Sequence, residues 1–246
     1  MSGVELLLLL GAGLAGGLTG SIAGLASLVT YPALLAVGLG PVAANVTNTV
    51  SLVFSSVGST LGSRPELEGQ AHRVRTLALA AVSGGAAGAT LLLLTPSETF
   101  EKIAPWLIGI ASLAILVRPR VHAGEPARPV ALSAGVFLIA IYGGYFGAAA
   151  GVMALALMLV ASGDTLARSN ALKNVVLGIA NAVAAIGFAL LGDVDWLAVL
   201  PLAAGLLAGG RLGPVVVRHS NATLLRGIIG VAGLALAIKL GLDAYG

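Results

Sequence analysis

Apolar residues along the chain form long stretches, which short polar or helix-breaking clusters separate. A helix needs about 20 predominantly apolar residues to cross a ~30 Å hydrocarbon core. The stretches that reach or approach this length are 41–62, 76–95, 99–117, 168–191, 195–217 and 223–241. Glycines interrupt two longer apolar stretches, 4–37 and 130–161, near their middles. The pattern predicts an all-α, polytopic membrane helical bundle.

The two interrupted stretches predict helical hairpins. From Val4 to the Gly16-Gly17 pair is about 13 residues, or ~20 Å of helix, which is too short to cross the bilayer core. The second copy has the same shape, with 130–142 and 152–161 on either side of its glycines. Irregular backbone at membrane depth must be buried in protein or line a polar cavity. We therefore expect two Gly-broken hairpins with tips at membrane depth, one entering from each face, and three spanning helices with each.

The second half of the chain repeats the first. The matching blocks are 16–24 with 143–151, 45–49 with 170–174, 84–88 with 209–213, and Thr99 and Lys102 with Thr223 and Arg226. The separation stays between 124 and 127 residues, and a constant offset carries more weight than glycine matches in a glycine-rich chain. We predict a single membrane domain, 1–246, with an internal repeat, 4–118 and 130–242, and a linker, 119–129.

The basic residues predict an orientation. Three arginines lie between 63 and 75 and three more between 118 and 129, whereas 95–102 carries two glutamates and one lysine. Lys and Arg concentrate in cytoplasmic connections. We therefore expect 63–75 and 118–129 on the cytoplasmic side.

The second half has the opposite charge pattern. Its connection 192–195 has no positive charge, whereas Arg218 and Arg226 flank the next one. Matching positions are thus basic in one half and acidic in the other, which is typical of inverted repeats. A parallel repeat with four crossings in each half remains the alternative.

Composition agrees with a membrane protein and narrows the chemistry. The chain is 58% hydrophobic and 9% charged, whereas soluble domains carry about 25% charged residues. Its 35 glycines suit closely packed membrane helices. The net charge of +3 is explained by basic helix ends, so we expect no nucleic-acid partner. There is no cysteine, and the three histidines lie in connections, so we expect no metal site and no cofactor.

The glycine-rich tips are the first candidate for a binding site. Backbone amides and helix N-termini around Gly20, Ser21 and Gly147 are expected to bind an anion. The alternative is close helix packing, because Gly16, Gly20 and Gly24 have small-xxx-small spacing.

Polar residues on two matching helix faces are the second candidate. The first face has Asn45, Asn48, Thr49, Ser56 and Ser59, and the second has Asn170, Lys173, Asn174 and Asn181. Serines in membrane helices usually bond their own backbone, and we interpret Ser55 and Thr60 in that way. Asparagine amides have four hydrogen-bonding positions that lipid cannot satisfy. We therefore predict a polar lining, with interhelical hydrogen bonding as the alternative.

The charges inside the membrane segments favour an anion. Lys173 and Arg211 lie within segments, although either side chain could extend to the cytoplasmic side. Every carboxylate lies in a connection or near a segment end. Cation transporters generally need a buried acidic residue. No nucleophile–base pair is visible either, so we do not expect an enzyme.

These blocks together resemble the sulfite exporter TauE/SafE family over nearly the whole chain. The segments that carry the resemblance are Gly16 to Pro32, Gly38 to Pro41, Ala44 to Thr49, Gly143 to Gly151, Arg168 to Asn174, 192–196 and 209–213. The resemblance implies a multi-pass inner-membrane protein that moves sulfite, thiosulfate or sulfonates. Many members have Gly-Gly-Gly at the tips, whereas Ser21 to Ala23 and Ala148 to Ala150 carry side chains here.

The sequence thus predicts a secondary anion transporter in the lipid bilayer, with alternating access to a central site between inverted repeats. The alternatives are an anion channel and a structural membrane protein without a substrate. The sequence leaves a homo-oligomer open.

Overall fold

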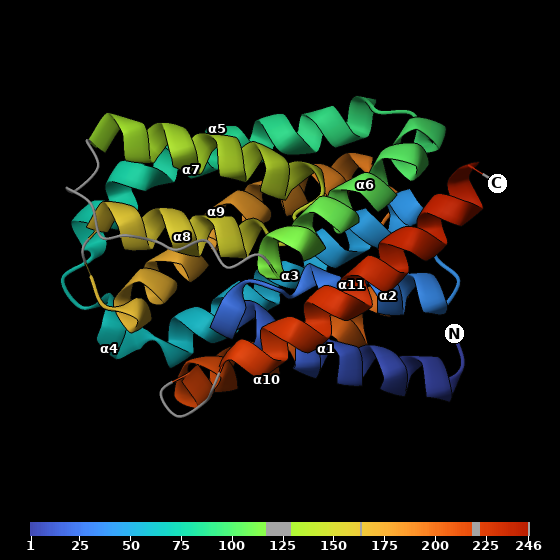
Figure 1. The fold of residues 1–246 in the computed structure, drawn as a ribbon, viewed down its shortest axis with the longest axis horizontal. Helices are drawn as coiled ribbons and strands as arrows, with labels where there is room; N and C mark the ends of the chain where they lie inside the picture. Colours follow the sequence, from blue (N-terminus) through green and yellow to red (C-terminus); the bar gives the residue numbers. More distant parts are fainter. Residues whose placement is uncertain (117–128, 163, 218–221, 246) are drawn as a thin grey trace.

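The computed structural model describes residues 1–116, 129–162, 164–217 and 222–245. These residues form helices and short turns, with no β-strand among them (Figure 1). The helices are α1 (Gly3–Ala23), α2 (Ser27–Ala36), α3 (Pro41–Gly62), α4 (Arg64–Leu67), α5 (Ala71–Leu94), α6 (Ser97–Leu116), α7 (Pro129–Tyr145), α8 (Ala150–Ser162), α9 (Leu166–Leu191), α10 (Trp196–Val217) and α11 (Ala222–Tyr245). The prediction of an all-α bundle is confirmed.

Four of the described helices are long and apolar enough to cross a membrane: α1, α5, α9 and α10. The chain is therefore an integral membrane protein. The six uninterrupted stretches of the sequence correspond to α3, α5, α6, α9, α10 and α11. Pro41 begins α3, where its missing N–H costs no hydrogen bond.

The expected break of the first hairpin at Gly16-Gly17 is wrong. Helix α1 continues through this pair for 21 residues and ends at Gly24, whose φ of 74° suits glycine. A Cβ on Gly17 would lie 2.5 Å from the carbonyl oxygen of Leu206. The glycines inside α1 therefore permit close packing on α10, and α1 is long enough to span. In the second hairpin, the break between α7 and α8 includes Gly147, with φ 77°.

Long-range helix pairs join the two halves of the chain. Helix α1 packs on α10, and α10 also packs on α3. In the same way α7 packs on α5, and α5 also packs on α9. A Cβ on Gly210 would lie 2.5 Å from the Ser55 oxygen, and one on Gly85 would lie 2.5 Å from the Ala180 oxygen. The counterparts of α1, α10 and α3 in the other half are α7, α5 and α9. Replacing each helix by its counterpart therefore turns the first two packed pairs into the second two.

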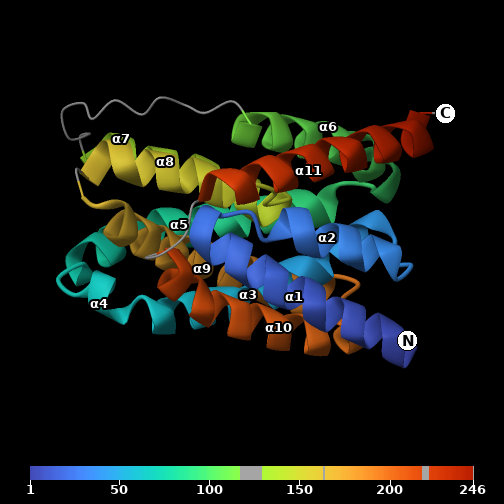
Figure 2. The same ribbon diagram turned by 60° about the horizontal axis from the view of Figure 1, so that its bottom comes forward.

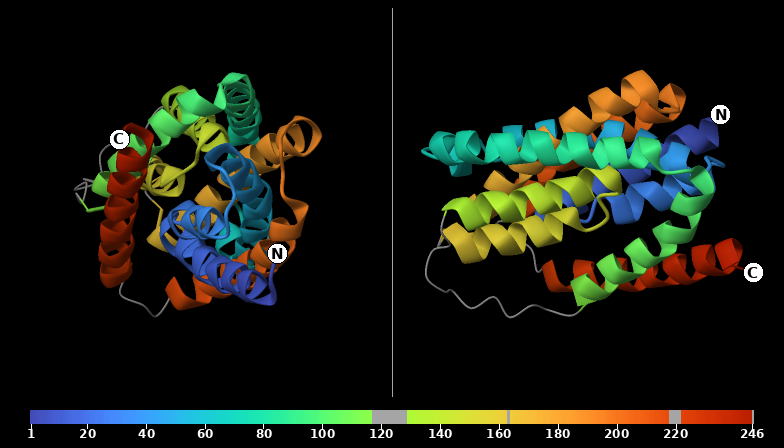
Figure 3. Two further views of the ribbon diagram at one scale, coloured as in Figure 1. Left: turned by 90° about the vertical axis from the view of Figure 1, so that its right-hand side faces the viewer. Right: turned by 90° about the horizontal axis from the view of Figure 1, so that it is seen from above.

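The directions of the helices are also opposed. In Figure 1, α1 runs from right to left, whereas α7 runs from left to right. Helices α6 and α11 pack side by side and run in opposite directions, forming one flank of the bundle (Figures 2 and 3). The tips of the hairpins meet at the centre, where Gly24 and Gly151 approach so closely that a Cβ on either would overlap the backbone of the other.

One end of the bundle has most of the arginines among the described residues, and we call it the basic end. Arg64 and Arg73 lie at the end where α4 connects α3 to α5, at the left of Figure 1. Asp164, just before α9, forms ion pairs with Arg73 and with Arg168, the latter at 3.6 Å. Nearly all of the expected linker 119–129, together with Arg118 and Arg218, lies outside the described residues, and the side chain of Arg226 is likewise not described.

Candidate functional site

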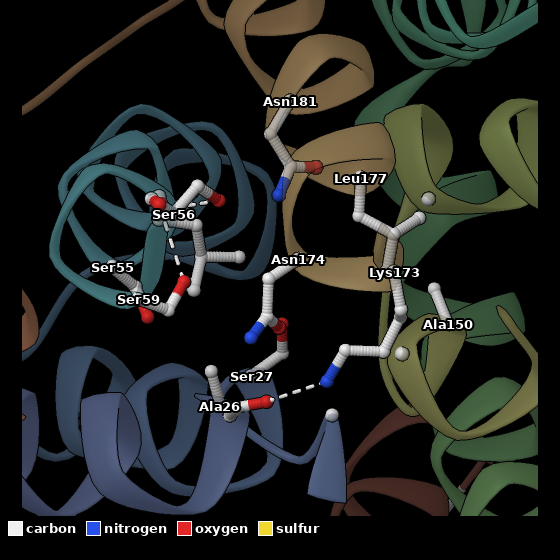
Figure 4. A pocket seen from close by; sticks show the side chains of 16 residues that line it. Ala26, Ser27, Ser55, Ser56, Ser59, Ala150, Lys173, Asn174, Leu177 and Asn181 are labelled. Carbon is white, nitrogen blue, oxygen red and sulfur yellow. Dashed lines mark hydrogen bonds between the residues drawn. The ribbon is translucent and has the colours of Figure 1, made fainter. Parts of the chain in front are cut away.

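A pocket of about 60 Å³ lies between the hairpin tips and the polar faces of α3 and α9 (Figure 4). The tips contribute Gly20, Gly24, Ala26, Ser27, Gly143, Gly147, Ala150 and Gly151. The long helices contribute Leu52, Ser55, Ser56, Ser59, Lys173, Asn174, Leu177 and Asn181. Since roughly 10–15 Å³ suffices for one water, the pocket has room for a few waters or one small ion.

The pocket lies where matching positions of the two halves face each other. Gly20 and Gly147, like Gly24 and Gly151, are 127 residues apart, and both pairs line it. Leu52 and Leu177 are 125 residues apart and also line it, as do Ser56 and Asn181 at the same offset. Both halves therefore contribute to one shared pocket.

Lys173 is the charged group of this pocket. Its side chain is 1% exposed, so it lies inside the protein instead of extending to the end of the bundle. Its Nζ donates a hydrogen bond of 3.1 Å to the carbonyl oxygen of Gly20, and Figure 4 shows the amine beside the Asn174 amide. Among the described residues that line the pocket, none is acidic. The pocket therefore has a positive local charge.

Two helix N-termini add to that positive charge. Helix α2 begins at Ser27 and α8 at Ala150, and both residues line the pocket. Within the described residues, the amides of Ser27 and Gly151 have no hydrogen-bond acceptor. A helix N-terminus carries roughly half a positive charge and directs N–H groups at its ligand. The arrangement suits a small anion.

Serines of α3 face the asparagines of α9 across the pocket (Figure 4). Ser56 and Ser59 donate to backbone oxygens of their own helix, at 3.3 and 3.2 Å. Asn181 is half-buried and directs its amide toward this space. These groups provide polar contacts for the oxygens of an anion or for its waters.

Two of the expected site residues hold the hairpin tips instead of lining the pocket. Asn45 of α3 donates to the Tyr145 carbonyl oxygen at 2.8 Å, and Asn170 of α9 donates to the Ser21 carbonyl oxygen at 2.7 Å. Each long helix thus binds the hairpin of the other half. The Oδ1 atoms of Asn45 and Asn170 are both buried without a hydrogen-bond partner in the described structure.

The remaining expected residues are divided between the pocket and its surroundings. Gly20, Gly147, Lys173 and Asn174 line the pocket, and Ser21, Asn48 and Thr49 do not. Asn48 accepts from Thr30 at 2.5 Å and donates to Ser27 at 3.2 Å. Thr49 donates to the backbone oxygen of Asn45.

Ser27 and Ser55 line the pocket although the sequence did not predict either as a site residue. Ser55 was expected to bond only its own backbone, and nothing in its spacing distinguishes it from such a serine. Ser27 follows the left-handed Gly24, which ends α1 and so brings the first turn of α2 to the pocket. The glycine at the actual break was the available signal.

Together, a bilayer-spanning helical fold and a buried positive pocket shared by two halves define a polytopic membrane protein with a central polar site. The chain belongs to the sulfite exporter TauE/SafE family, whose model matches residues 9–240. It is therefore a membrane transporter, and the resemblance found in its sequence is confirmed.

Curated relatives agree with this assignment. The chain is 28% identical over 236 residues to the Escherichia coli K12 protein named "Probable membrane transporter protein YfcA", covering 94% of this chain and 87% of the relative. It is 26% identical to "Probable membrane transporter protein ORF9" of a Sinorhizobium species, covering 91% and 87%. A Haemophilus influenzae relative with the same description is 26% identical, covering 91% and 89%. No solved structure matches the chain.

Proposed function

We propose that this protein is a secondary transporter of small sulfur-containing anions, such as sulfite, thiosulfate or sulfonates, across the cytoplasmic membrane. The observation that carries the proposal is the ammonium of Lys173, buried at a pocket whose described lining has no carboxylate. The family description, sulfite exporter, supports sulfur oxyanions as the substrate class.

The bound anion accepts hydrogen bonds from the Asn174 amide and from the free N–H groups at the starts of α2 and α8, and it pairs with Lys173. The Lys173 ammonium shifts its hydrogen bond from the Gly20 oxygen toward the anion. Asn45 and Asn170 keep the tips in position through their amide bonds to the opposite hairpins. No covalent step is required, and release follows when water reaches the pocket.

The proposed mechanism is alternating access between two inverted repeats, 4–118 and 130–242. The opposed directions of α1 and α7, the exchanged helix pairs and the shared pocket support this arrangement. In such transporters the halves exchange their tilts around a fixed central site. The direct contact of Gly24 with Gly151 brings the two hairpin tips together beside the pocket, where such a central site would lie.

Anion uptake into proteoliposomes tests the proposal. We expect saturable uptake of labelled sulfite or thiosulfate, with Lys173→Ala reducing it at least ~10-fold, because a desolvated charge–charge hydrogen bond contributes about 1.5–3 kcal/mol. Lys173→Arg should retain part of the activity. Lys239→Ala, which removes an exposed lysine of α11, is the matched control and should leave uptake unchanged.

The outcomes separate the alternatives. Unchanged uptake in the Lys173→Ala protein would rule out the assigned site. Large currents that do not saturate would indicate a channel. If no sulfur oxyanion is transported or raises the melting temperature, the chain has no such substrate, because a ligand that binds only the folded state must stabilise it.

A further inference from the structure

An aromatic cluster lies on the side of the hairpin tips away from the basic end. It consists of Tyr31 from α2, Phe100 from α6, and Tyr145 and Phe146 from the end of α7 and the turn that follows. The chain has only five phenylalanines, four tyrosines and two tryptophans, so four of its eleven aromatic residues lie together here. We call these four residues the aromatic cluster.

The rings fill this region tightly. Tyr31 meets Phe146 edge-on, with ring centroids 5.4 Å apart, and Phe100 lies 5.8 Å from Phe146 and 5.9 Å from Tyr145. Tyr31, Phe100 and Phe146 are each at most 2% exposed. Centroid distances of 4.5–7 Å in tilted or edge-on geometry are favourable for aromatic pairs.

The cluster begins directly beside the pocket. Phe146 precedes the pocket residue Gly147, and Tyr31 lies one helical turn after the pocket residue Ser27. Phe100 is in the first turn of α6, at the end of the bundle opposite to α4. Along this direction the rings therefore lie between the pocket and the end of the bundle that is not basic.

The other direction from the pocket is closed by smaller groups. Ser59 is one turn from the basic end of α3, and Lys173 is two turns from the basic end of α9. At the offset of 127 residues, Tyr31, Tyr145 and Phe146 correspond to Met158, Leu18 and Thr19, so none of these three rings has an aromatic counterpart in the other half. The two directions from the pocket are thus closed unequally.

We infer that the aromatic cluster is the outer gate of this transporter, that this gate is closed in this structure, and that the smaller groups toward the basic, cytoplasmic end open more readily than the rings. The inference rests on the proposed function for its role in transport, but accessibility can be measured without any transport. Helix α6 contributes Phe100 to the gate. Asn45 holds Tyr145, on the other side of the gate, in place by donating to its carbonyl oxygen.

The gate contains a feature that favours opening. The hydroxyl of Tyr31 is buried without a hydrogen-bond partner in the described structure. A buried polar group without a partner destabilises the state that buries it. When the gate opens, water can hydrogen-bond this hydroxyl. The closed state is therefore less stable, relative to the open state, than it would be with phenylalanine in place of Tyr31.

The chain has no native cysteine, so a single introduced thiol reports access to the pocket. The parent for the experiment is Ser56→Cys, which places the thiol in the pocket wall. A membrane-impermeant charged maleimide is applied to right-side-out or inside-out vesicles. We expect fast labelling from the cytoplasmic face and slow labelling from the outer face.

Two substitutions should move outer labelling in opposite directions. Phe100→Ala should raise its rate about tenfold or more, because minor states of such two-state proteins are populated at roughly 0.1–10%. Tyr31→Phe should lower it. Phe54→Ala removes an aromatic ring of α3 that is 42% exposed and outside the cluster, and it should change nothing. Phe100→Leu, which keeps apolar volume, gives a smaller increase and replaces Phe100→Ala if that protein does not fold.

Equal labelling of the parent from both faces, or outer labelling unaffected by the Phe100 substitutions in folded protein, would overturn the gate. If labelling changes as expected but no anion is taken up, the proposed function fails and the gate remains. If uptake is saturable and outer labelling does not respond, the gate fails and the proposed function remains.

Discussion

At the scale of single residues, the hairpin tips depend on the absence of Cβ atoms. Gly24 ends α1 in the left-handed region and touches the backbone of Gly151. Gly38 also has a positive φ, 92°, but a Cβ there would have nothing within 4 Å. Alanine substitutions at these two glycines therefore distinguish the cost of a strained backbone from the cost of a steric clash.

Gly24→Ala should severely destabilise the protein. The new methyl adds overpacking, typically ~1–3 kcal/mol, to the left-handed strain of about 1–2 kcal/mol. Gly38→Ala is the matched control and should show only the strain. Melting temperatures in detergent measure both, and equal shifts for the two proteins would contradict the tip contact.

The charge of the pocket predicts selectivity between similar sulfonates. Lys173 repels a second positive group, and the described lining offers no carboxylate to bind one. Isethionate should therefore compete with sulfite uptake at least ~10-fold better than taurine, which has an ammonium in place of the hydroxyl; tenfold corresponds to about 1.4 kcal/mol. Competition curves in proteoliposomes measure the ratio. Taurine competing as well as isethionate would show that the pocket does not select by charge.

Single residues were only partly predictable from the sequence. Lys173 and Asn174 were recognisable because an ammonium and an amide in a membrane helix need polar partners, and both line the pocket. Asn45 and Asn170 carried the same signal but bind the opposite hairpins. The sequence could not distinguish these roles, because they depend on which faces of α3 and α9 meet the tips.

At the scale of helices, glycine provides contact surfaces. A Cβ on Gly209 of α10 would overlap the Leu14 oxygen of α1, and a Cβ on Gly88 of α5 would overlap the Ile141 oxygen of α7. Such contacts let the backbones approach closely, which lipid-embedded helices need because apolar burial drives them together only weakly.

Gly209→Ala should therefore weaken the pairing of α10 with α1. The expected overpacking cost of ~1–3 kcal/mol exceeds the gain in helix propensity of about 1 kcal/mol. Gly11→Ala is the control: Gly11 lies in α1, but its Cβ position has open space around it, so this substitution should be neutral or slightly stabilising. Thermal unfolding distinguishes them, and a Gly209→Ala protein at least as stable as its parent would show that α1 and α10 are not packed this closely.

The helix boundaries followed from the apolar stretches, because span length and breaking residues are encoded locally. The exception was α1, where Gly16-Gly17 resembled a break. A glycine pair inside a helix and a glycine turn have the same composition. Only the neighbouring helix α10, distant in sequence, determines which of them forms.

At the scale of the whole molecule, the two ends of the bundle differ in charge. Arg64, Arg73, Arg75 and Arg168 are at one end, where Glu66, Glu68 and Asp164 also lie. Among the described residues the other end has six carboxylates, including Glu5, Glu98 and Asp193, against Lys102 and Lys239. Both chain ends, marked N and C in Figure 1, lie at the acidic end. The positive-inside rule then assigns the connection around α4 to the cytoplasm.

Reporter fusions test this orientation. Alkaline phosphatase fused after Tyr245 should be active, because it folds outside the cytoplasm, whereas a fusion after Glu68 should be inactive. A fluorescent protein that matures only in the cytoplasm should give the opposite pattern. Phosphatase activity at Glu68 alone would reverse the orientation, and with it the face of the membrane on which the aromatic cluster lies.

The pairing of α1 with α10 has a consequence for how the protein is made. Gly13 contacts Leu202, which the ribosome adds about 190 residues later. At ~5–20 residues per second this takes roughly 10–40 s. During that time α1, which is rich in leucine, is stable in the lipid bilayer without α10. Helix α3 buries Asn45, Thr47 and Asn48, and lipid cannot provide hydrogen bonds for these side chains. We therefore expect α3 to leave the translocon late, or to be shielded by an insertion factor until the second half arrives.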